Sequence, residues 1–167
     1  GMMAIEGDIE DAAASPIFAK YPAVLGDERM TAFICDYLRI MSTGNMAPHE
    51  LEGLFDMELL SLKEELDHPS HAVTGIADGM PGFGIVAAVL GIVVTMASLG
   101  EGDQAAIGMH VGAALVGTFF GILAAYGFFG PLATCLAHDA KEEVNLYESI
   151  KASLVASASG MPPSLAV

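Results

Sequence analysis

Hydrophobic and polar positions follow three different patterns along this 167-residue chain. In residues 1–79, apolar side chains recur every three or four positions among many charges, which predicts amphipathic helices. From Met80 to Leu99 the sequence contains no charged residue, and from Ala105 to Ala137 it contains no Asp, Glu, Lys or Arg. The amphipathic pattern then returns. These patterns predict an all-α chain whose middle is far more apolar than its ends.

Residues 1–79 are predicted to hold amphipathic helices that pack on one another, and residues 137–167 are predicted to hold one amphipathic cytoplasmic helix. Asp27 and Gly44 are placed to cap the first long helix at its N- and C-terminal ends. The final region is expected to continue the preceding apolar helix. The apolar positions at helical spacing are Met30, Phe33, Ile34, Tyr37, Leu38, Met41, Leu51, Leu54, Phe55, Leu59, Val144, Tyr147, Ile150 and Leu154.

The two uncharged runs are long enough to cross a lipid bilayer. At ~1.5 Å rise per residue, about 20 helical residues span the ~30 Å hydrocarbon core. We expect one membrane helix over 80–99, a polar loop over 100–106, and a second membrane helix over 107–136 that extends into water. Pro81 would lie in the first turn of the first span, where its missing N–H is harmless. A buried hairpin of a soluble protein is the alternative, and the short polar loop between two such runs disfavours it.

The basic residues around this hairpin predict its orientation. The polar loop has no Lys or Arg, whereas Lys63 precedes the hairpin and Lys141 and Lys151 follow it. Because cytoplasmic flanks carry the excess of Lys and Arg, both flanking regions are expected on the cytoplasmic side. The start of the chain lacks the basic and apolar segments of a secretory signal peptide.

Charge and composition exclude several functions. The formal net charge is −15, and residues 1–80 contain 15 acidic and four basic side chains, a net charge of −11. Nucleic acid is therefore not an expected partner, because binding phosphates requires Lys and Arg. Cys35 and Cys135 lack metal-site or redox spacing and are expected to be reduced thiols. We find no nucleophile–base pair, metal cluster or phosphate loop, so no enzymatic activity, metal or cofactor is predicted.

Small residues recur along both apolar runs. Helices in lipid associate through close packing of small side chains. Thr118 either makes a polar contact with a partner or bonds a carbonyl three or four residues back on its own helix. His110 is expected at the membrane interface. The glycines predicted to pack the helices are Gly84, Gly91, Gly108, Gly112, Gly117 and Gly121.

Neither apolar run carries an Asp, Glu, Lys or Arg, the side chains expected of an intramembrane proton carrier. If the protein takes part in ion transport, the titrating carboxylate must come from another chain.

The two apolar runs resemble the third and fourth transmembrane helices of the MotA family of flagellar stator proteins, which belongs with TolQ and ExbB. They read GMPGFGIVAAVLGIVVTMASLG and IGMHVGAALVGTFFGILAAYGFFGPLA. The segments MAIEGDIED, SPIFAKYP and FICDYLRIMSTG resemble the cytoplasmic loop of that family. The resemblance covers nearly the whole chain. It implies a fragment of a multi-pass protein of the bacterial inner membrane, without the first two transmembrane helices.

The resemblance also implies a function. Proteins of this kind form, with MotB, a proton-conducting complex that couples ion flow to torque on the rotor protein FliG. The implied assembly is a five-subunit ring around MotB, whose transmembrane Asp carries the ion, in contact with membrane lipid. An energy-transducing proton channel subunit of the ExbB/TolQ type is the alternative, and a purely structural membrane hairpin is a third possibility.

Three residues receive ion-pathway roles from the resemblance alone. Thr118 matches the hydroxyl position near the ion-carrying Asp of MotB, and Tyr126 matches a tyrosine near the inner mouth of the pathway. Ala88 falls where sodium-driven relatives tend to have Thr. Its methyl group offers no oxygen to a dehydrated Na⁺, so protons are the expected ion.

Three further residues receive roles in force generation from the same resemblance. Pro81 and Pro131 match two prolines of the family that lie at the cytoplasmic ends of the third and fourth membrane helices. The family needs these prolines to generate torque. Proline is also common at helix ends, so a simple structural role stays open for both. Glu6 matches the acidic loop residue that pairs electrostatically with FliG, while the arginine that precedes it in the family is absent here.

Overall fold

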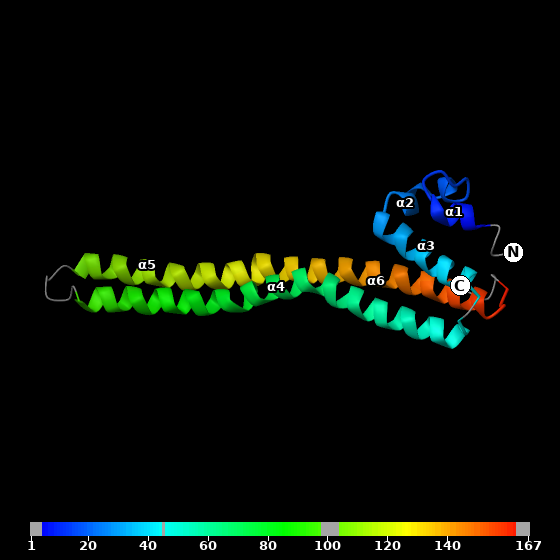
Figure 1. Ribbon diagram of the computed structural model, residues 1–167. Coiled ribbons are helices and arrows are strands. Elements are labelled where there is room, and N and C mark those ends of the chain that lie inside the picture. The colour runs from blue at the N-terminus through cyan, green and yellow to red at the C-terminus, as the bar shows by residue number, and fades with distance from the viewer. Residues whose placement is uncertain (1–4, 45, 98–103, 163–167) are drawn as a thin grey trace. The chain divides into compact units, whose positions relative to one another are not determined.

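The computed structural model describes residues 5–44, 46–97 and 104–162, without the side chains of Gln104 and Ala106. Every regular element in these ranges is helical, in agreement with the predicted all-α fold (Figure 1). The chain divides into two compact units: unit 1 comprises residues 1–63 and 142–167, and unit 2 comprises residues 64–141. The elements are α1 (Glu6–Glu10), η2 (Phe18–Lys20), α2 (Pro22–Leu25), α3 (Glu28–Ser42), α4 (Pro48–Ala97), α5 (Gln104–Leu123), η4 (Ala124–Phe129) and α6 (Gly130–Ala158).

The caps predicted for the first long helix are confirmed. The Asp27 carboxylate accepts a hydrogen bond of 3.0 Å from the backbone N–H of Met30 at the start of α3. At the other end Thr43 is the last partly helical residue, and Gly44 follows with φ of +65°, which only glycine adopts readily. The sequence therefore located α3 to within a residue at each end.

The core of unit 1 is a cluster of aromatic rings between α3, the first turns of α4 and the last turns of α6. Tyr37 stacks on Phe55 with ring centroids 3.6 Å apart, and Phe33 meets Tyr147 edge-on at 4.9 Å. Phe55 and Tyr147 are fully buried. Leu54, which was expected on the packed face, is instead 40% exposed. Successive helical residues point about 100° apart, so Leu54 and the buried Phe55 cannot share one face.

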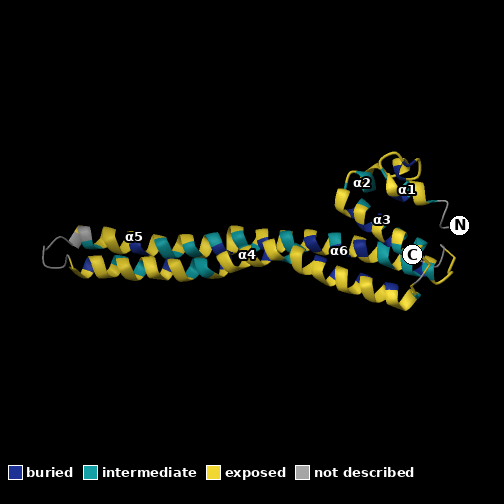
Figure 2. Ribbon diagram, viewed as in Figure 1, coloured by how far each residue is buried: buried dark blue, intermediate teal, exposed yellow. Residues whose placement is uncertain are grey.

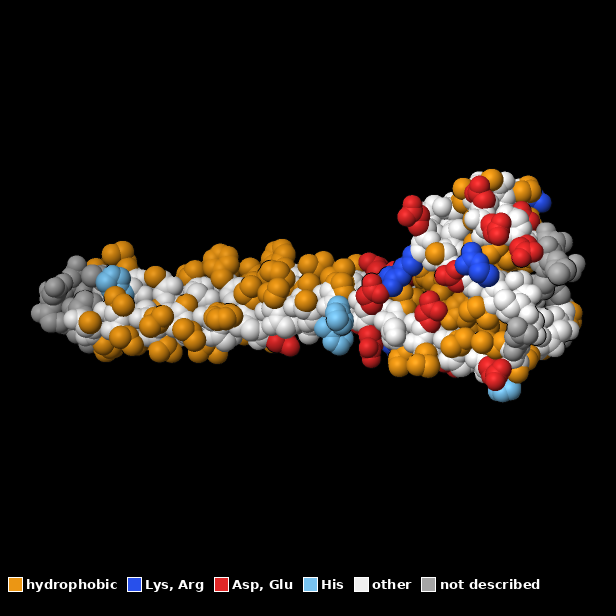
Figure 3. Space-filling view, viewed as in Figure 1, with side chains coloured by type: hydrophobic (Ala, Val, Ile, Leu, Met, Phe, Trp, Pro, Cys, Tyr) orange, Lys and Arg blue, Asp and Glu red, His pale blue; other side chains and the backbone are white. Residues whose placement is uncertain are grey.

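Unit 2 is a helical hairpin in which the second half of α4 runs beside α5 and η4 (Figure 1). Two helical stretches, Pro48–Ala97 and Ile107–Ala158, are long and apolar enough to cross a membrane. Only 11% of the most apolar window of each is buried within the chain. Large apolar side chains cover the outside of the hairpin, where Figures 2 and 3 show them as exposed and hydrophobic. Apolar side chains on the outside of a helix pair are typical of a membrane hairpin and unlike the buried apolar core of a soluble protein.

Two predicted boundaries differ from the structure. No helix begins at residue 80: α4 is continuous from Pro48, and both Pro69 and Pro81 lie inside it. Pro81 is therefore not in a first turn, and the loss of charged residues at residue 80 is not accompanied by a break in the helix. Of the expected loop over 100–106, residues 100–103 lie outside the described residues, and residues 104–106 already belong to α5. The second span was expected to continue as a helix, and α6 follows η4 directly and extends to Ala158.

Candidate functional site

The candidate site is the contact between α4 and α5 around Thr118. Its hydroxyl donates a hydrogen bond of 3.2 Å to the backbone carbonyl of Gly84 on the facing helix. The sequence left open a hydrogen bond from Thr118 to a carbonyl of its own helix, but the observed acceptor belongs to the facing helix. Thr95 behaves in the other way: it is buried, and its hydroxyl donates to the Gly91 carbonyl four residues back, at 2.8 Å.

This contact depends on two glycines that let the backbones approach. A Cβ added to Gly84 would lie 2.9 Å from the Gly117 carbonyl oxygen and 3.1 Å from Cα of Thr118. A Cβ added to Gly121 would lie 2.6 Å from the Met80 carbonyl oxygen. Real Cβ atoms almost never approach backbone atoms so closely, so any larger residue would force the helices apart. Gly84 and Gly121 therefore lie where α4 and α5 approach each other most closely, as a packing role requires.

Closer to the turn of the hairpin, the packing uses alanines that the sequence analysis did not single out. A Cβ on Gly91 would overlap the side chain of Ala114, and a Cβ on Gly117 would lie 2.9 Å from that of Ala87. Ala114 is 6% exposed. An alanine carries no pattern that separates it from its apolar neighbours in a membrane helix, so only the register of the two helices reveals it.

Gly108 and Gly112, which were also predicted to pack helices, lie apart from the contact between α4 and α5 in the described part of the chain. A Cβ built on either residue meets no atom within 4 Å in the described part of the chain. The reason is geometric: Gly108 precedes Gly117 by nine residues, about two and a half helical turns, so the two point in opposite directions. The two GxxxG motifs of α5 thus lie on different faces, and the packed face holds Gly117 and Gly121.

A cleft of about 330 Å³ lies in unit 2 beside η4. Its lining includes Thr74 and Asp78 of α4. From the other half of the hairpin it includes Tyr126 of η4 and Thr134 and His138 of α6. Tyr126 is 74% exposed. Tyr126 was a predicted site residue, whereas Asp78 and His138 were not. That these two line the same cleft as Tyr126 depends on how the two helices pair, which the sequence does not reveal.

A second hydrogen bond joins the helices at this level. The hydroxyl of Ser70, which is 6% exposed, donates to the carbonyl of Ala133 at 3.1 Å. Like the bond of Thr118, it runs from a side chain on one helix to the backbone of the other. Because the Ser70 hydroxyl is buried, water does not compete for this bond, which helps to fix the register of the two helices. Nothing in the local sequence distinguishes Ser70 from a surface serine.

The helix preceding Pro131 has a wide turn. Residues Ala124–Phe129 form a π-helix, and the N–H of Gly130 bonds the carbonyl of Ala125, five residues back. Pro131 follows directly and has no N–H of its own to donate. Single π-turns inside α-helices are frequent at functional sites and produce bends. The sequence offered a signal for this irregularity in Gly127, Gly130 and Pro131, but not its form.

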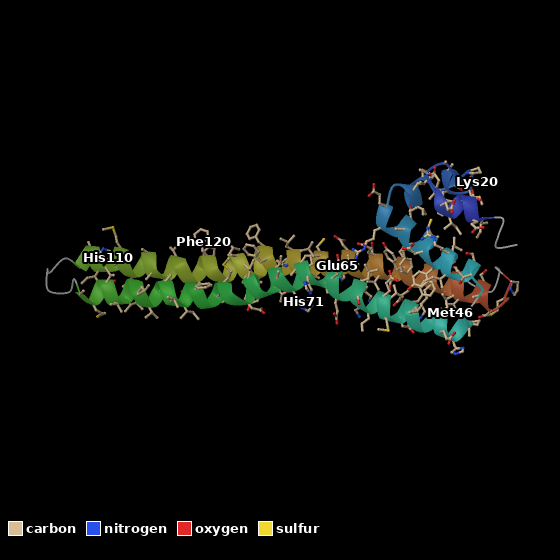
Figure 4. The ribbon with its side chains drawn as sticks, in the orientation of Figure 1. Lys20, Met46, Glu65, His71, His110 and Phe120 are labelled. Atoms are coloured by element: carbon tan, nitrogen blue, oxygen red, sulfur yellow. The ribbon has the colours of Figure 1, made fainter. Side chains whose placement is uncertain are left out.

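The remaining predicted residues lie apart from this contact. Ala88 is half-buried in the hairpin, and Phe120, two residues beyond Thr118, points away from α4 (Figure 4). Glu6 is the first residue of α1 in unit 1 and is exposed. Of its acidic neighbours, Glu10 is exposed and Asp8 is half-buried. One of them, Asp8, accepts a hydrogen bond of 2.6 Å from the hydroxyl of Ser15 and so holds the local fold.

Comparison with known proteins agrees with the fold and the hairpin. The profile of the MotA/TolQ/ExbB proton channel family matches residues 27–149. The chain is 43% identical to chemotaxis protein LafT of Vibrio parahaemolyticus and 42% identical to motility protein A of Salmonella typhimurium, each over 167 residues. All of this chain is covered, but it spans only 58% and 56% of the lengths of these relatives.

Two solved structures share the fold. The structure of C. jejuni MotAB superposes with a TM-score of 0.73 at 18% identity, over 99% of this chain and 63% of that one. The flagellar MotAB stator complex of Bacillus subtilis gives a TM-score of 0.71 at 21% identity, over 81% of this chain and 52% of that one. Because the family profile covers most of the sequence, the chain belongs to the MotA/TolQ/ExbB proton channel family.

Proposed function

We propose that this chain is part of a flagellar motor stator subunit, which with MotB conducts protons across the bacterial inner membrane and applies torque to FliG. The observation that carries the proposal is the Thr118–Gly84 contact, which puts a hydroxyl in the seam of an otherwise uncharged hairpin. The similarity to motility protein A and LafT along the whole chain supports a motor over other members of the family. The two apolar runs contain no Asp, Glu, Lys or Arg, so we assign the ion-carrying carboxylate to the Asp of MotB.

The chemistry of Thr118 suits a partner carboxyl group. A hydroxyl has one hydrogen to donate and two lone pairs to accept with. Its hydrogen is used by the Gly84 carbonyl, and the half-buried oxygen still can accept. A protonated Asp of MotB or a water molecule would donate to it, so Thr118 orients the acid form of the carrier. Ala88 adds no oxygen ligand, which favours protons because hard cations such as Na⁺ bind through oxygen.

The cleft at Tyr126 and the turn at Pro131 are proposed as the cytoplasmic part of the mechanism. Tyr126 and its polar neighbours would receive the proton at the inner mouth. Pro131, preceded by η4, and Pro81, inside α4, are positions where a helix bends at low cost because a backbone hydrogen bond is already missing. Movement there would be passed to the cytoplasmic region of a ring of five subunits.

The rotor contact is proposed at α1. Glu6, Asp8, Glu10 and Asp11 give this short stretch four carboxylates and no base. An acidic surface steers and binds a basic one, as expected for charged groups of FliG. This arrangement requires both ends of the chain to lie in the cytoplasm, as the distribution of Lys and Arg predicts.

The proposal is tested in a Salmonella chimera, in which these 167 residues replace the matching segment of motility protein A. Thr118→Val keeps the shape of the side chain but removes the hydroxyl, and it is expected to abolish swimming and proton flow while the complex still assembles. Thr118→Ser keeps the hydroxyl and serves as the matched control, which should swim. If the Thr118→Val chimera swims as fast as the chimera that keeps Thr118, the role assigned to the Thr118 hydroxyl is refuted. A chimera that cannot swim but restores an ExbB- or TolQ-dependent process would favour that alternative.

A further inference from the structure

Unit 1 contains a groove of about 600 Å³ between the first turns of α4 and the last turns of α6. Its floor is apolar and incompletely covered: Leu60 is 62% exposed and Met161 is 48% exposed. Both residues lie outside the two uncharged runs of the sequence. Burying Leu60 and Met161 against another apolar surface would be favourable, because it removes apolar area from water.

Charged side chains of both signs line the rim of this groove. Lys151, which is 19% exposed, reaches across from α6 to Asp56 on α4 at 2.5 Å and to Glu52 at 3.8 Å. Lys63 and Glu148 also line the groove. Three carboxylates thus face two ammonium groups, which leaves one negative charge over. A ligand for this groove should present apolar side chains together with one positive charge.

The same chain presents a surface of that description around η2. Ile17 is 47% exposed and Tyr21 is 61% exposed. Lys20 lies between them in the sequence and at the surface of unit 1 (Figure 4). Lys20 is the only charged residue between Ala12 and Gly26, in a region that is otherwise strongly acidic. We call residues Ile17–Tyr21 the η2 knob. Pro16 and Pro22 bound it and limit its freedom, which lowers the entropy lost on docking.

Within one chain the knob cannot reach the groove, because α3 stands between them. Phe18, at the base of the knob, packs with Ile9 against Cys35 of α3. Phe33 of the same helix packs against Tyr147 of α6. Figure 1 shows α1 and α2 on one side of α3, with α4 and α6 on the other. The two complementary surfaces therefore point away from each other in unit 1.

We infer that the η2 knob of one copy docks into the α4–α6 groove of a second copy. Tyr21 and Ile17 then cover Leu60 and Met161, and Lys20 meets the carboxylate of Glu148. Such a head-to-tail contact uses a different surface on each partner, so it closes into a ring or continues as a filament. A second copy is the occupant because every copy carries both surfaces with matching charge. The inference rests on the proposed function only for the membrane ring in which the contact would operate.

Disulfide trapping in membranes tests the contact directly on the 167-residue chain. The background is Cys135→Ser, since Cys135 is exposed whereas Cys35 is buried. Differently tagged copies carrying Tyr21→Cys and Leu60→Cys are co-expressed and oxidised. The control replaces Leu60→Cys by Leu146→Cys, which is 46% exposed on α6 but does not line the groove. We expect about fivefold or more covalent dimer over this control, because disulfides form only between Cα atoms within ~7 Å.

Three results would overturn the inference. The first is a yield no higher than in the Leu146 control, and the second is equal dimer formation by Tyr21→Cys alone, which would indicate a symmetric contact. The third is capture of another protein at Leu60→Cys in place of the second copy. Both substituted positions are more than 60% exposed, so loss of folding does not explain a missing dimer.

A charge reversal supplies an independent readout. Lys20→Glu should lower the trapped dimer by about tenfold, because it places two negative charges against each other across the interface. Glu148→Lys on the groove copy should restore it, whereas Glu10→Lys, outside the groove, should not. Failure of Glu148→Lys to restore the dimer would contradict the contact. The trapping needs neither motility nor proton flow, so the contact and the proposed function can each fail alone.

Discussion

Gly84→Ala should separate the two helices of the hairpin and weaken the Thr118 hydrogen bond. The new methyl group would lie 2.9 Å from the Gly117 carbonyl oxygen, 3.1 Å from Cα of Thr118 and 3.3 Å from Cα of Gly121. All three neighbours are backbone atoms, so no flexible side chain can yield. To restore ordinary contact the helices must move apart by several tenths of an ångström. That shift would carry the Thr118–Gly84 bond, already 3.2 Å long, toward the limit of hydrogen bonding.

The free energy of the change combines three effects. Overpacking costs about 1–3 kcal/mol, and loss of a hydrogen bond between membrane helices costs about 0.6 kcal/mol. Alanine recovers about 0.5–1 kcal/mol because it favours the helix over glycine. The net destabilisation expected for Gly84→Ala is therefore about 1–3 kcal/mol.

Gly112→Ala is the matched control, because a Cβ there meets nothing within 4 Å in the described part of the chain. It should be neutral, or stabilising by up to about 1 kcal/mol through helix propensity. The assay is SDS-driven unfolding in mixed micelles, followed by energy transfer between dyes on cysteines at Met96 and Met109, both exposed near the hairpin turn. Equal unfolding free energies for the two variants would refute the close-packed seam.

Two buried phenols of unit 1 give further predictions, both measured by thermal or denaturant unfolding followed by circular dichroism. The Tyr37 hydroxyl donates to Glu58 at 2.6 Å, so Tyr37→Phe should cost about 1 kcal/mol at neutral pH. Burial and the Glu58 carboxylate raise the pKa of Tyr37, so its stabilisation is present below the unfolded pKa of about 10 and lost as the pH rises above it. The variant should therefore lose less stability than the parent above pH 10, and parallel curves would contradict this assignment. Tyr147 is 1% exposed, and its hydroxyl has no hydrogen-bond partner among the described residues, so Tyr147→Phe should stabilise by about 1 kcal/mol; a marked destabilisation would show that the hydroxyl has a partner.

The sequence predicted helices well where local signals decide the structure. Asp27 and Gly44 act within a few residues of themselves, and the spacing of Phe33 and Tyr37 requires only that the helix have one buried face. The helix ends near the membrane boundary were not predictable in the same way. Pro81 and the loss of charge at residue 80 are typical of a helix start, but α4 passes through both. A change from water to lipid alters which side chains are favoured and leaves the backbone hydrogen bonds in place.

The candidate site was predictable in its chemistry and not in its geometry. The sequence identified Thr118 and the glycines as the unusual members of an uncharged run, because few other groups there can bond or allow close approach. It could not choose between the faces of α5. Gly108-x-x-x-Gly112 and Gly117-x-x-x-Gly121 are equal as motifs, and only pairing with α4 selects the second. Ser70 and Ala114 were missed for the same reason, since their roles arise from residues more than 20 positions away.

The pairing of Thr118 with Gly84 makes the two residues one functional element. If Gly84 carried a side chain, the hydroxyl could not reach its carbonyl, and Thr118 would turn to its own helix, as Thr95 does toward Gly91. The hydroxyl oxygen would then point along the helix groove instead of across the seam. A serine or threonine in a membrane span is therefore not enough to indicate a pathway. What gives Thr118 its orientation is a glycine 34 residues earlier in the chain, and any proton-handling role for the hydroxyl depends on that glycine as much as on Thr118 itself.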